Sequence, residues 1–102
     1  MIRVLVTPRA RADIERIFDF QFSLAPREAA ARIDTLLAAL RELRERPYAG
    51  RPATVGLREL IIAAAGGGYL ALYRYDEVLR TVYVLALRSQ RERGYKRDPL
   101  GT

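Results

Sequence analysis

The sequence predicts an α+β fold in which an antiparallel sheet carries a helical hairpin on one face. Apolar residues recur every three or four positions through two consecutive segments of the first half, which indicates two helices. The second half contains β-branched and aromatic runs separated by turn residues, which indicate strands. Helices and strands that are segregated along a chain in this way are typical of α+β domains, here in the order strand, helix, helix and three strands.

A short strand is predicted at the start of the chain. Residues 2–6 alternate, so that Ile2, Val4 and Val6 share one side. Because this strand follows the first residue directly, without the longer apolar segment of a signal peptide, we expect a cytoplasmic protein. The most apolar stretch is too short for a membrane span and contains charges, so no membrane partner is expected.

The first helix is predicted to begin at Pro8, after Thr7. A Thr side chain can accept from the unpaired amides of a helix start, and the missing N–H of a proline costs nothing at the first position. The apolar positions at helical spacing are Ala10, Ile14, Ile17 and Phe18. Phe20 and Phe22 widen this apolar arc beyond a normal core stripe, which suggests contact with a partner; a thick contact with the second helix is the alternative.

The second helix is predicted from Pro26 to the residues before Pro47. Its apolar seam repeats with alternating steps of four and three, as in one arm of an antiparallel helical hairpin, and consists of Ala29, Ile33, Leu36, Leu40 and Leu43. Turn-forming residues then fill positions 47–52.

Three strands are predicted in the second half, at Leu57–Ala64, Tyr69–Tyr75 and Thr81–Arg88. Turns at 66–68 and 75–77 separate them. With 102 residues, the chain is expected to form one domain over residues 1–102.

The composition restricts the available chemistry. Cysteine and histidine are both absent, which excludes disulfides, thiol nucleophiles and the usual transition-metal ligands. No acidic pair has the spacing of a carboxylate cage, so neither a metal nor a cofactor is expected. A net charge of +6 favours an anionic partner, although a codon bias toward arginine would produce the same charge.

Two basic features are candidates for a functional site. Arg58 shares one side of its predicted strand with Leu60. Because burial of an unpaired guanidinium is costly, Arg58 should lie at the rim of the sheet, where it is either paired with a carboxylate or faces a site. The segment 88–98 carries five positive and two negative residues around Tyr95, which suits contact with phosphates and bases; a frayed, solvated tail is the alternative. Proton transfer would fall to Tyr95, to the sole lysine, Lys96, or to a few carboxylates, which lowers the odds of nuclease chemistry.

The chain resembles the RelE/ParE toxins along nearly its whole length. The matching motifs, in order, are Val4–Ala10 with Asp13-Ile14, the Pro47–Pro52 connector, Leu57–Leu60, Tyr69–Tyr73 and Val84–Arg88 before Arg91-Glu92. This resemblance implies the toxin of a type II toxin-antitoxin system, with a role such as plasmid stabilisation and growth inhibition, held in a hetero-oligomer by its cognate antitoxin. It also implies that the first strand lies beside the last one.

The resemblance implies two possible targets. The ParE-like branch poisons DNA gyrase without a known bond-breaking site, and the RelE-like branch cleaves messenger RNA on the ribosome. The nuclease branch uses an arginine after the helical hairpin and an arginine and tyrosine near the end, which Arg58, Arg91 and Tyr95 match. Where nuclease relatives carry connector lysines, this chain has Arg51 and Pro52, so the ParE-like branch is favoured. A non-toxic module that binds an antitoxin or RNA is a further alternative.

We therefore expect two sites. The residues expected to bind the target are Arg51, Arg58, Arg88, Arg91, Arg93 and Tyr95, and those expected to bind the antitoxin are Ile14, Phe18, Phe20 and Phe22.

Overall fold

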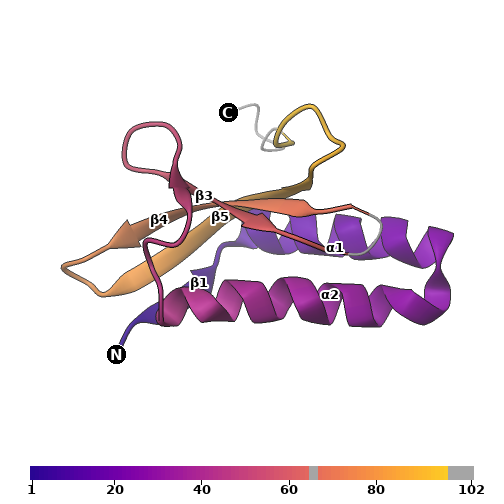
Figure 1. Ribbon diagram of the computed structural model, residues 1–102, viewed down its shortest axis with the longest axis horizontal. Helices are drawn as coiled ribbons and strands as arrows, with labels where there is room; N and C mark the ends of the chain where they lie inside the picture. The colour runs from indigo at the N-terminus through magenta and orange to yellow at the C-terminus, as the bar shows by residue number, and fades with distance from the viewer. Residues whose placement is uncertain (65–66, 97–102) are drawn as a thin grey trace.

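Two α-helices and a five-stranded sheet form two layers in the computed structural model, which describes residues 1–64 and 67–96 (Figure 1). Helices α1 (Pro8–Leu24) and α2 (Pro26–Arg41) lie against one face of the sheet. The predicted α+β class, with a helical hairpin on one face, is confirmed. The first residue of the predicted turn at 66–68 and the last two residues of the basic segment 88–98 lie outside the described residues.

The order of the strands in the sheet is β1-β5-β4-β3-β2. Their bounds are Arg3–Val6 for β1, Arg51–Pro52 for β2, Arg58–Ile62 for β3, Tyr69–Asp76 for β4 and Thr81–Ser89 for β5. The three strands predicted in the second half form the expected antiparallel meander of β3, β4 and β5. The sheet thus differs from the predicted one mainly at its two edges.

The first edge strand, β1, lies beside β5, as the resemblance implies. The two strands are parallel, with Val4 opposite Val82 and Val6 opposite Val84, so the sheet is mixed rather than antiparallel throughout. Most of the chain separates β1 from β5, and no tight hairpin forces an antiparallel direction on this pair.

The second edge strand, β2, lies within the segment predicted as a turn. Arg51 pairs with Glu59 and Pro52 with Arg58, the first two residues of β3. A proline has no N–H to donate to a ladder, which is tolerated at the edge of a sheet.

Both helices begin as the sequence predicts. The Thr7 hydroxyl oxygen lies 3.2 Å from the Ala10 amide, which donates to it, and 2.9 Å from the Val84 carbonyl, to which the hydroxyl donates. This side chain therefore starts α1 and ties it to β5. Helix α2 ends earlier than predicted, at Arg41, and continues as the 3₁₀ turn η1 (Glu42–Arg44), a common tightening of a last turn.

The core lies between the helices and the sheet. Alternate residues of β4, Tyr69, Ala71 and Tyr73, are buried in the cluster that includes the helix residues Leu36 and Leu40. The opposite face of the sheet carries the segment that follows β5 (Figure 1). Within the described part of the chain, no helix has the length and apolar character needed to span a bilayer.

Candidate functional site

Glu59 is the centre of a charged cluster on the sheet face opposite the helices. It lies in β3 between two residues whose side chains face the other way, Arg58 and Leu60. One carboxylate oxygen accepts from Arg51 Nη2 at 2.6 Å, and the other accepts from the Tyr95 hydroxyl at 2.7 Å. The carboxylate thereby joins the edge strand β2 to the chain segment after β5.

The hydrogen bond between Tyr95 and Glu59 contributes to a pKa shift of both groups. The Tyr95 hydroxyl and the Arg51 guanidinium lower the pKa of Glu59. Burial, followed by the hydrogen bond to Glu59, raises the pKa of Tyr95 far above its ordinary value. Tyr95 therefore stays a neutral phenol at physiological pH, and its proton is donated to Glu59.

Residues 90–96, which follow β5, are docked onto the protein rather than frayed. The Arg88 guanidinium lies 5.3 Å from the Tyr95 ring centroid, and Arg88 Nη1 donates to the Glu92 carbonyl at 2.6 Å. The Glu92 carboxylate forms an ion pair with Arg16 of α1. These contacts hold residues 88–96 against both the sheet and α1.

Arg58 holds the connector that follows the helical hairpin. Its Nη1 donates to the carbonyl oxygen of Gly50 at 2.7 Å and to that of Tyr48 at 3.3 Å, and its guanidinium lies 4.9 Å from the Tyr48 ring centroid. Among the described residues no carboxylate lies within ion-pair distance of Arg58, so the expected ion pair is not formed. Backbone carbonyls take the place of a carboxylate.

The connector is fixed a second time by a buried tyrosine. The Tyr73 hydroxyl donates to the Pro47 carbonyl and accepts from the Gly50 amide, both at 2.8 Å. A side chain at Gly50 would lie 2.6 Å from Tyr73 Cε1, so only glycine fits this close approach. The connector is thus a rigid part of the surface.

The structure brings together three of the six residues expected to bind the target. Arg51, Arg88 and Tyr95 surround Glu59, as described above. Arg58 lies on the helix-facing side of β3, and Arg91 lines a groove beside α1. Arg93 is exposed. The three residues matched to a nuclease site, Arg58, Arg91 and Tyr95, therefore do not converge on one point.

The apolar residues expected to bind the antitoxin lie on two flanks of α1. At 3.6 residues per turn, Phe20 and Phe22 are about 160° apart around the helix axis. Both are exposed, at 60% and 52%, whereas Ile14 is half-buried against the core and Phe18 packs on Phe22 with their ring centroids 5.9 Å apart. The sequence predicted a single wide apolar arc on α1. In the structure the buried residues of α1 lie between the Phe20 flank and the flank of Phe18 and Phe22, so the arc is divided in two.

A groove of about 360 Å³ lies beside the Phe20 flank. Its apolar lining comes from Ile17, Phe20, Leu24 and Tyr69. The charged residues that line it are Arg16, Arg32, Arg91, Glu92 and Lys96, four basic and one acidic. This groove can bind an acidic segment with apolar side chains.

Sequence reasoning missed two parts of these sites. Glu59 alternates with Arg58 along the strand, which places it on the other face of the sheet but indicates no partner for it. Leu24, 63% exposed, lies one turn after Phe20, and this helical spacing is the signal that could have added it to the antitoxin-binding residues. In residues 1–64 and 67–96, no group of three or more acidic side chains could hold a metal ion.

Replacing Tyr95 by Phe is expected to raise the pKa of Glu59 toward its ordinary value, because the phenol is the largest cause of its lowering. The lowered pKa of Glu59 means that its stabilising contribution is present above pH 4.5, the ordinary value, and is lost as the pH falls through the folded-state value. The variant should therefore lose more stability at neutral pH than at about pH 3. Carboxyl NMR titration and urea unfolding at both pH values measure these effects, and an unchanged Glu59 titration would contradict the docking of Tyr95.

The chain is similar to toxins of toxin-antitoxin systems. The family model of the ParE toxin of the type II toxin-antitoxin system parDE matches residues 4–94. A curated relative, Toxin RelE3 of Caulobacter vibrioides, is 31% identical over 74 residues, which are 72% of this chain and 80% of that protein.

Two solved structures share the fold. The chromosomal ParDE system of P. aeruginosa matches with a TM-score of 0.73 and 24% identity, covering 87% of this chain and 96% of the other. The toxin-antitoxin complex RelBE2 of Mycobacterium tuberculosis matches with a TM-score of 0.57 and 27% identity, covering 87% and 98% of the two chains.

Proposed function

The chain belongs to the ParE toxin family of type II toxin-antitoxin systems, and we propose that it arrests growth by binding DNA gyrase without itself breaking a covalent bond. In this proposal the toxin works in the cytoplasm and is neutralised by its cognate antitoxin in a hetero-oligomer. The rigid outer face of the sheet, with Arg51, Arg88 and Tyr95, contacts the target.

The hydrogen bond that Tyr95 donates to Glu59 is the observation that carries the non-catalytic part of the proposal. A nuclease needs a group that accepts a proton from the attacking hydroxyl near neutral pH. Tyr95 has a strongly raised pKa and donates its proton to Glu59, while an arginine keeps its proton at any physiological pH. The Glu59 carboxylate has a lowered pKa and already accepts from Arg51 and Tyr95, which makes it a weak base. The outer face therefore offers positive charge and an aromatic ring, which suit binding rather than proton transfer.

The groove beside the Phe20 flank is the proposed docking site for the antitoxin. Its apolar floor and its excess of basic residues complement a segment that alternates apolar and acidic side chains. Exposed aromatic residues such as Phe20 provide large contact areas in protein interfaces.

A ribosome-dependent endoribonuclease is the second candidate function. Two observations favour it: the curated relative is named Toxin RelE3, and Arg88 stacks on Tyr95 in an arrangement that could hold a base and a phosphate. If the phenol of Tyr95 moves a proton in that reaction, its hydroxyl is needed as well as its ring.

The Tyr95→Phe variant separates the two candidates. It keeps the ring beside Arg88 but removes the ionisable hydroxyl. If gyrase is the target, the variant should inhibit supercoiling by purified gyrase within about threefold of the wild type, because the binding surface loses only one hydrogen bond.

Supercoiling and toeprint assays with wild type and variant, run side by side, decide the target. Unaffected supercoiling at excess wild-type toxin would contradict the proposal, and messenger cleavage that disappears in the variant would favour the nuclease. If expression without the antitoxin causes no growth arrest, the chain is a non-toxic binding module instead.

A further inference from the structure

The edge strand β2 covers only part of β3. It pairs with the first two residues of β3, Arg58 and Glu59. The remaining three residues, Leu60–Ile62, have no strand beside them in the part of the chain that the structure describes. An uncovered edge usually carries a charge, a proline or a bulge, which keep it from pairing with another chain. Leu60–Ile62 contains neither a charge nor a proline, and its register with β4 is regular, so this part of the edge is unprotected.

The backbone of Ile61 points toward this open edge. The Leu57 carbonyl accepts from the Ala53 amide at 3.0 Å, so it faces the side of β2. In an antiparallel strand the N–H and C=O groups of alternate residues point to the same side. Those of Glu59 therefore also face β2, and those of Ile61 point past the end of β2. The neighbours of Ile61 direct theirs to β4, which leaves one donor and one acceptor of Ile61 available to another chain.

Apolar surface lies on both sides of this edge. The Ile61 side chain is 53% exposed and lies on the outer face of the sheet, as Glu59 does. On the side of the helices, a groove of about 300 Å³ is lined by residues of β3, α2 and η1, among them Ala39, Leu43 and Leu60. A partner at this edge therefore gains apolar contacts as well as backbone hydrogen bonds.

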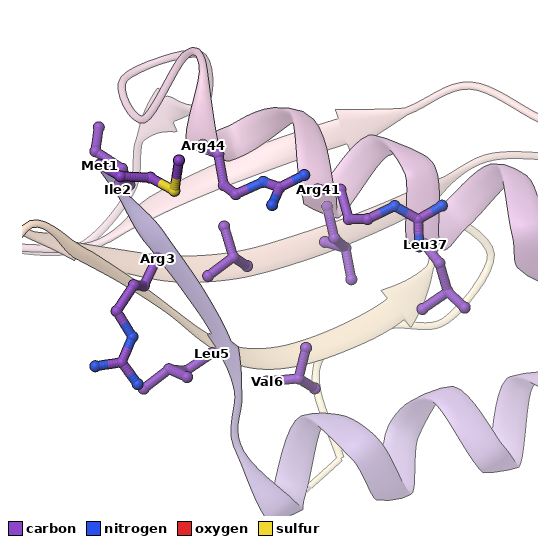
Figure 2. A pocket seen from close by; sticks show the side chains of 10 residues that line it. Met1, Ile2, Arg3, Leu5, Val6, Leu37, Arg41 and Arg44 are labelled. Atoms are coloured by element: carbon purple, nitrogen blue, oxygen red, sulfur yellow. The ribbon is translucent and has the colours of Figure 1, made fainter.

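The charges beside the β3 edge are balanced. The charged residues that line its groove are Glu42 and Arg46, one of each sign. The groove along β1, at the other edge of the sheet, is lined by Arg3, Arg41 and Arg44 without a carboxylate, and Figure 2 shows these arginines around the strand. Because like charges repel across an interface, a second copy of this chain would be repelled at the β1 edge but not at the β3 edge.

We propose that the Leu60–Ile62 edge pairs with the same edge of a second copy, so that the toxin forms a two-fold symmetric dimer with one continuous sheet. In an antiparallel pairing centred on Ile61, the Ile61 residues of the two copies exchange both backbone hydrogen bonds. Their side chains lie opposite each other on the outer face and shield each other from water. Such an interface is isologous, so the same patch serves on both copies.

The pairing is short, which makes the dimer weak. Strand β2 covers Glu59 on one side and β3 ends at Ile62 on the other, so each copy contributes three residues to the pairing. Interfaces that bury less than about 1,200 Å² belong to weak and transient associations. We therefore expect a dissociation constant of about 10–100 μM.

A second copy fits this edge better than an acidic segment of an antitoxin does. The groove beside the Phe20 flank has an excess of positive charge, whereas the charges of the groove at the β3 edge cancel. An acidic segment therefore gains no net attraction at the β3 edge. The two grooves have no lining residue in common, so a partner at one leaves the lining of the other uncovered.

The dimer would present two target surfaces on one side. The two-fold axis is perpendicular to the continuous sheet, so the outer faces of both copies, each with Arg51, Arg88 and Tyr95, point the same way. A target with two equivalent sites would then gain from effective concentration. This consequence rests on the proposed function, but the dimer itself does not.

Sedimentation velocity of the full chain between about 5 and 500 μM tests the dimer, which should appear over this range. Ile61→Lys places two like charges at the two-fold axis and should leave a monomer throughout. Val78→Lys adds the same charge at a position that is 91% exposed, between β4 and β5, and should dimerise within about threefold of the wild type. A monomeric wild type at every concentration, or equal association of the two variants, would overturn the proposal.

A cysteine variant tests the register, because the chain contains no cysteine of its own. Opposite residues in a hydrogen-bonded antiparallel pair have Cα atoms about 5.5 Å apart, within the range of about 4.4–6.8 Å that a disulfide spans. Mild oxidation should therefore cross-link Ile61→Cys at least about tenfold faster than the control Val78→Cys. Equal rates of cross-linking would contradict pairing at Ile61. This test also remains available if Ile61→Lys does not fold.

Hydrogen exchange identifies the backbone groups in contact. Exchange of the Ile61 amide should slow by at least about threefold between about 5 and 500 μM toxin, whereas the Leu60 amide, directed toward β4, should not change. An Ile61 amide that is protected by purified antitoxin, but not by a higher toxin concentration, would assign the edge to the antitoxin and overturn the dimer. Because these measurements involve no gyrase, their failure leaves the proposed target standing, and failure of the gyrase assay leaves the dimer standing.

Discussion

Replacing Asp13 by Ala is expected to lower the free energy of unfolding by about 3 kcal/mol, since it leaves a buried backbone amide without a partner and removes a buried carboxylate from a charged pair. Asp13 is 4% exposed and lies in α1. Its Oδ2 accepts from the Leu87 amide of β5 at 2.9 Å, and its Oδ1 lies 3.5 Å from Arg16 Nη2.

The importance of Asp13 follows from the unequal lengths of β1 and β5. The four residues of β1 pair only with residues 81–84, so within the described part of the chain the remainder of β5 has no strand on that side. An irregularity in the register between β4 and β5, at Leu72/Tyr73, changes which later residues of β5 face α1. Asp13 accepts from the Leu87 amide, and Arg16 donates to the Leu87 carbonyl at 3.4 Å, so two side chains of α1 replace the missing strand.

The matched control is Asp19→Ala, which removes an exposed carboxylate from the same helix. Its effect on the free energy of unfolding should stay within about 0.5 kcal/mol. Urea unfolding followed by circular dichroism measures both variants, with the midpoint and the slope compared. If Asp13→Ala and Asp19→Ala have the same midpoint, the hydrogen bond to Leu87 does not carry the stability assigned to it.

A sequence pattern can predict the elements of this fold but not long-range contacts such as the one made by Asp13. The spacing of apolar residues in α1, α2 and the three later strands predicted the two-layer fold. Apolar residues that repeat every 3.6 positions in a helix, or every 2 positions in a strand, lie on one face of the element, and that face is the one buried in the core. The parallel direction of β1 and the hydrogen bond between Asp13 and Leu87 depend on contacts between residues far apart in the sequence, 74 positions in the case of Asp13 and Leu87, and such contacts leave no local pattern.

The candidate sites were predictable only in part for the same reason. Basic residues near the end of the chain suggested a binding surface, and the structure places Arg88 and Tyr95 together there. Their common partner Glu59 lies 36 positions before Tyr95, so no spacing rule connects them. Arg58 looked like a site residue because it is a charge in a strand, yet its guanidinium is bound to connector carbonyls.

The antitoxin site is expected to fail when the Phe20 flank becomes acidic. Phe20→Glu combined with Leu24→Glu should weaken antitoxin binding by roughly a hundredfold or more, because exposed apolar anchors are lost and two negative charges face an acidic segment. Both side chains are more than half exposed, at 60% and 63%, so the fold should remain intact. The proposed gyrase surface lies on the sheet face opposite the helices, so inhibition of supercoiling should persist.

Phe22→Glu is the control for this prediction, because Phe22 is similarly exposed, at 52%, but lies on the other flank of α1. Isothermal titration with the purified antitoxin gives the two affinities, and co-expression in cells shows whether growth is rescued. The Phe20 and Leu24 variant should remain toxic in the presence of antitoxin, while Phe22→Glu should be neutralised. If Phe22→Glu were the variant that escapes, the antitoxin would bind the flank formed by Phe18 and Phe22, and the groove of Arg16, Arg32 and Arg91 would lose its assigned partner. Because the variants add negative charge to different flanks of α1, comparing their antitoxin affinities shows which side of α1 the antitoxin covers.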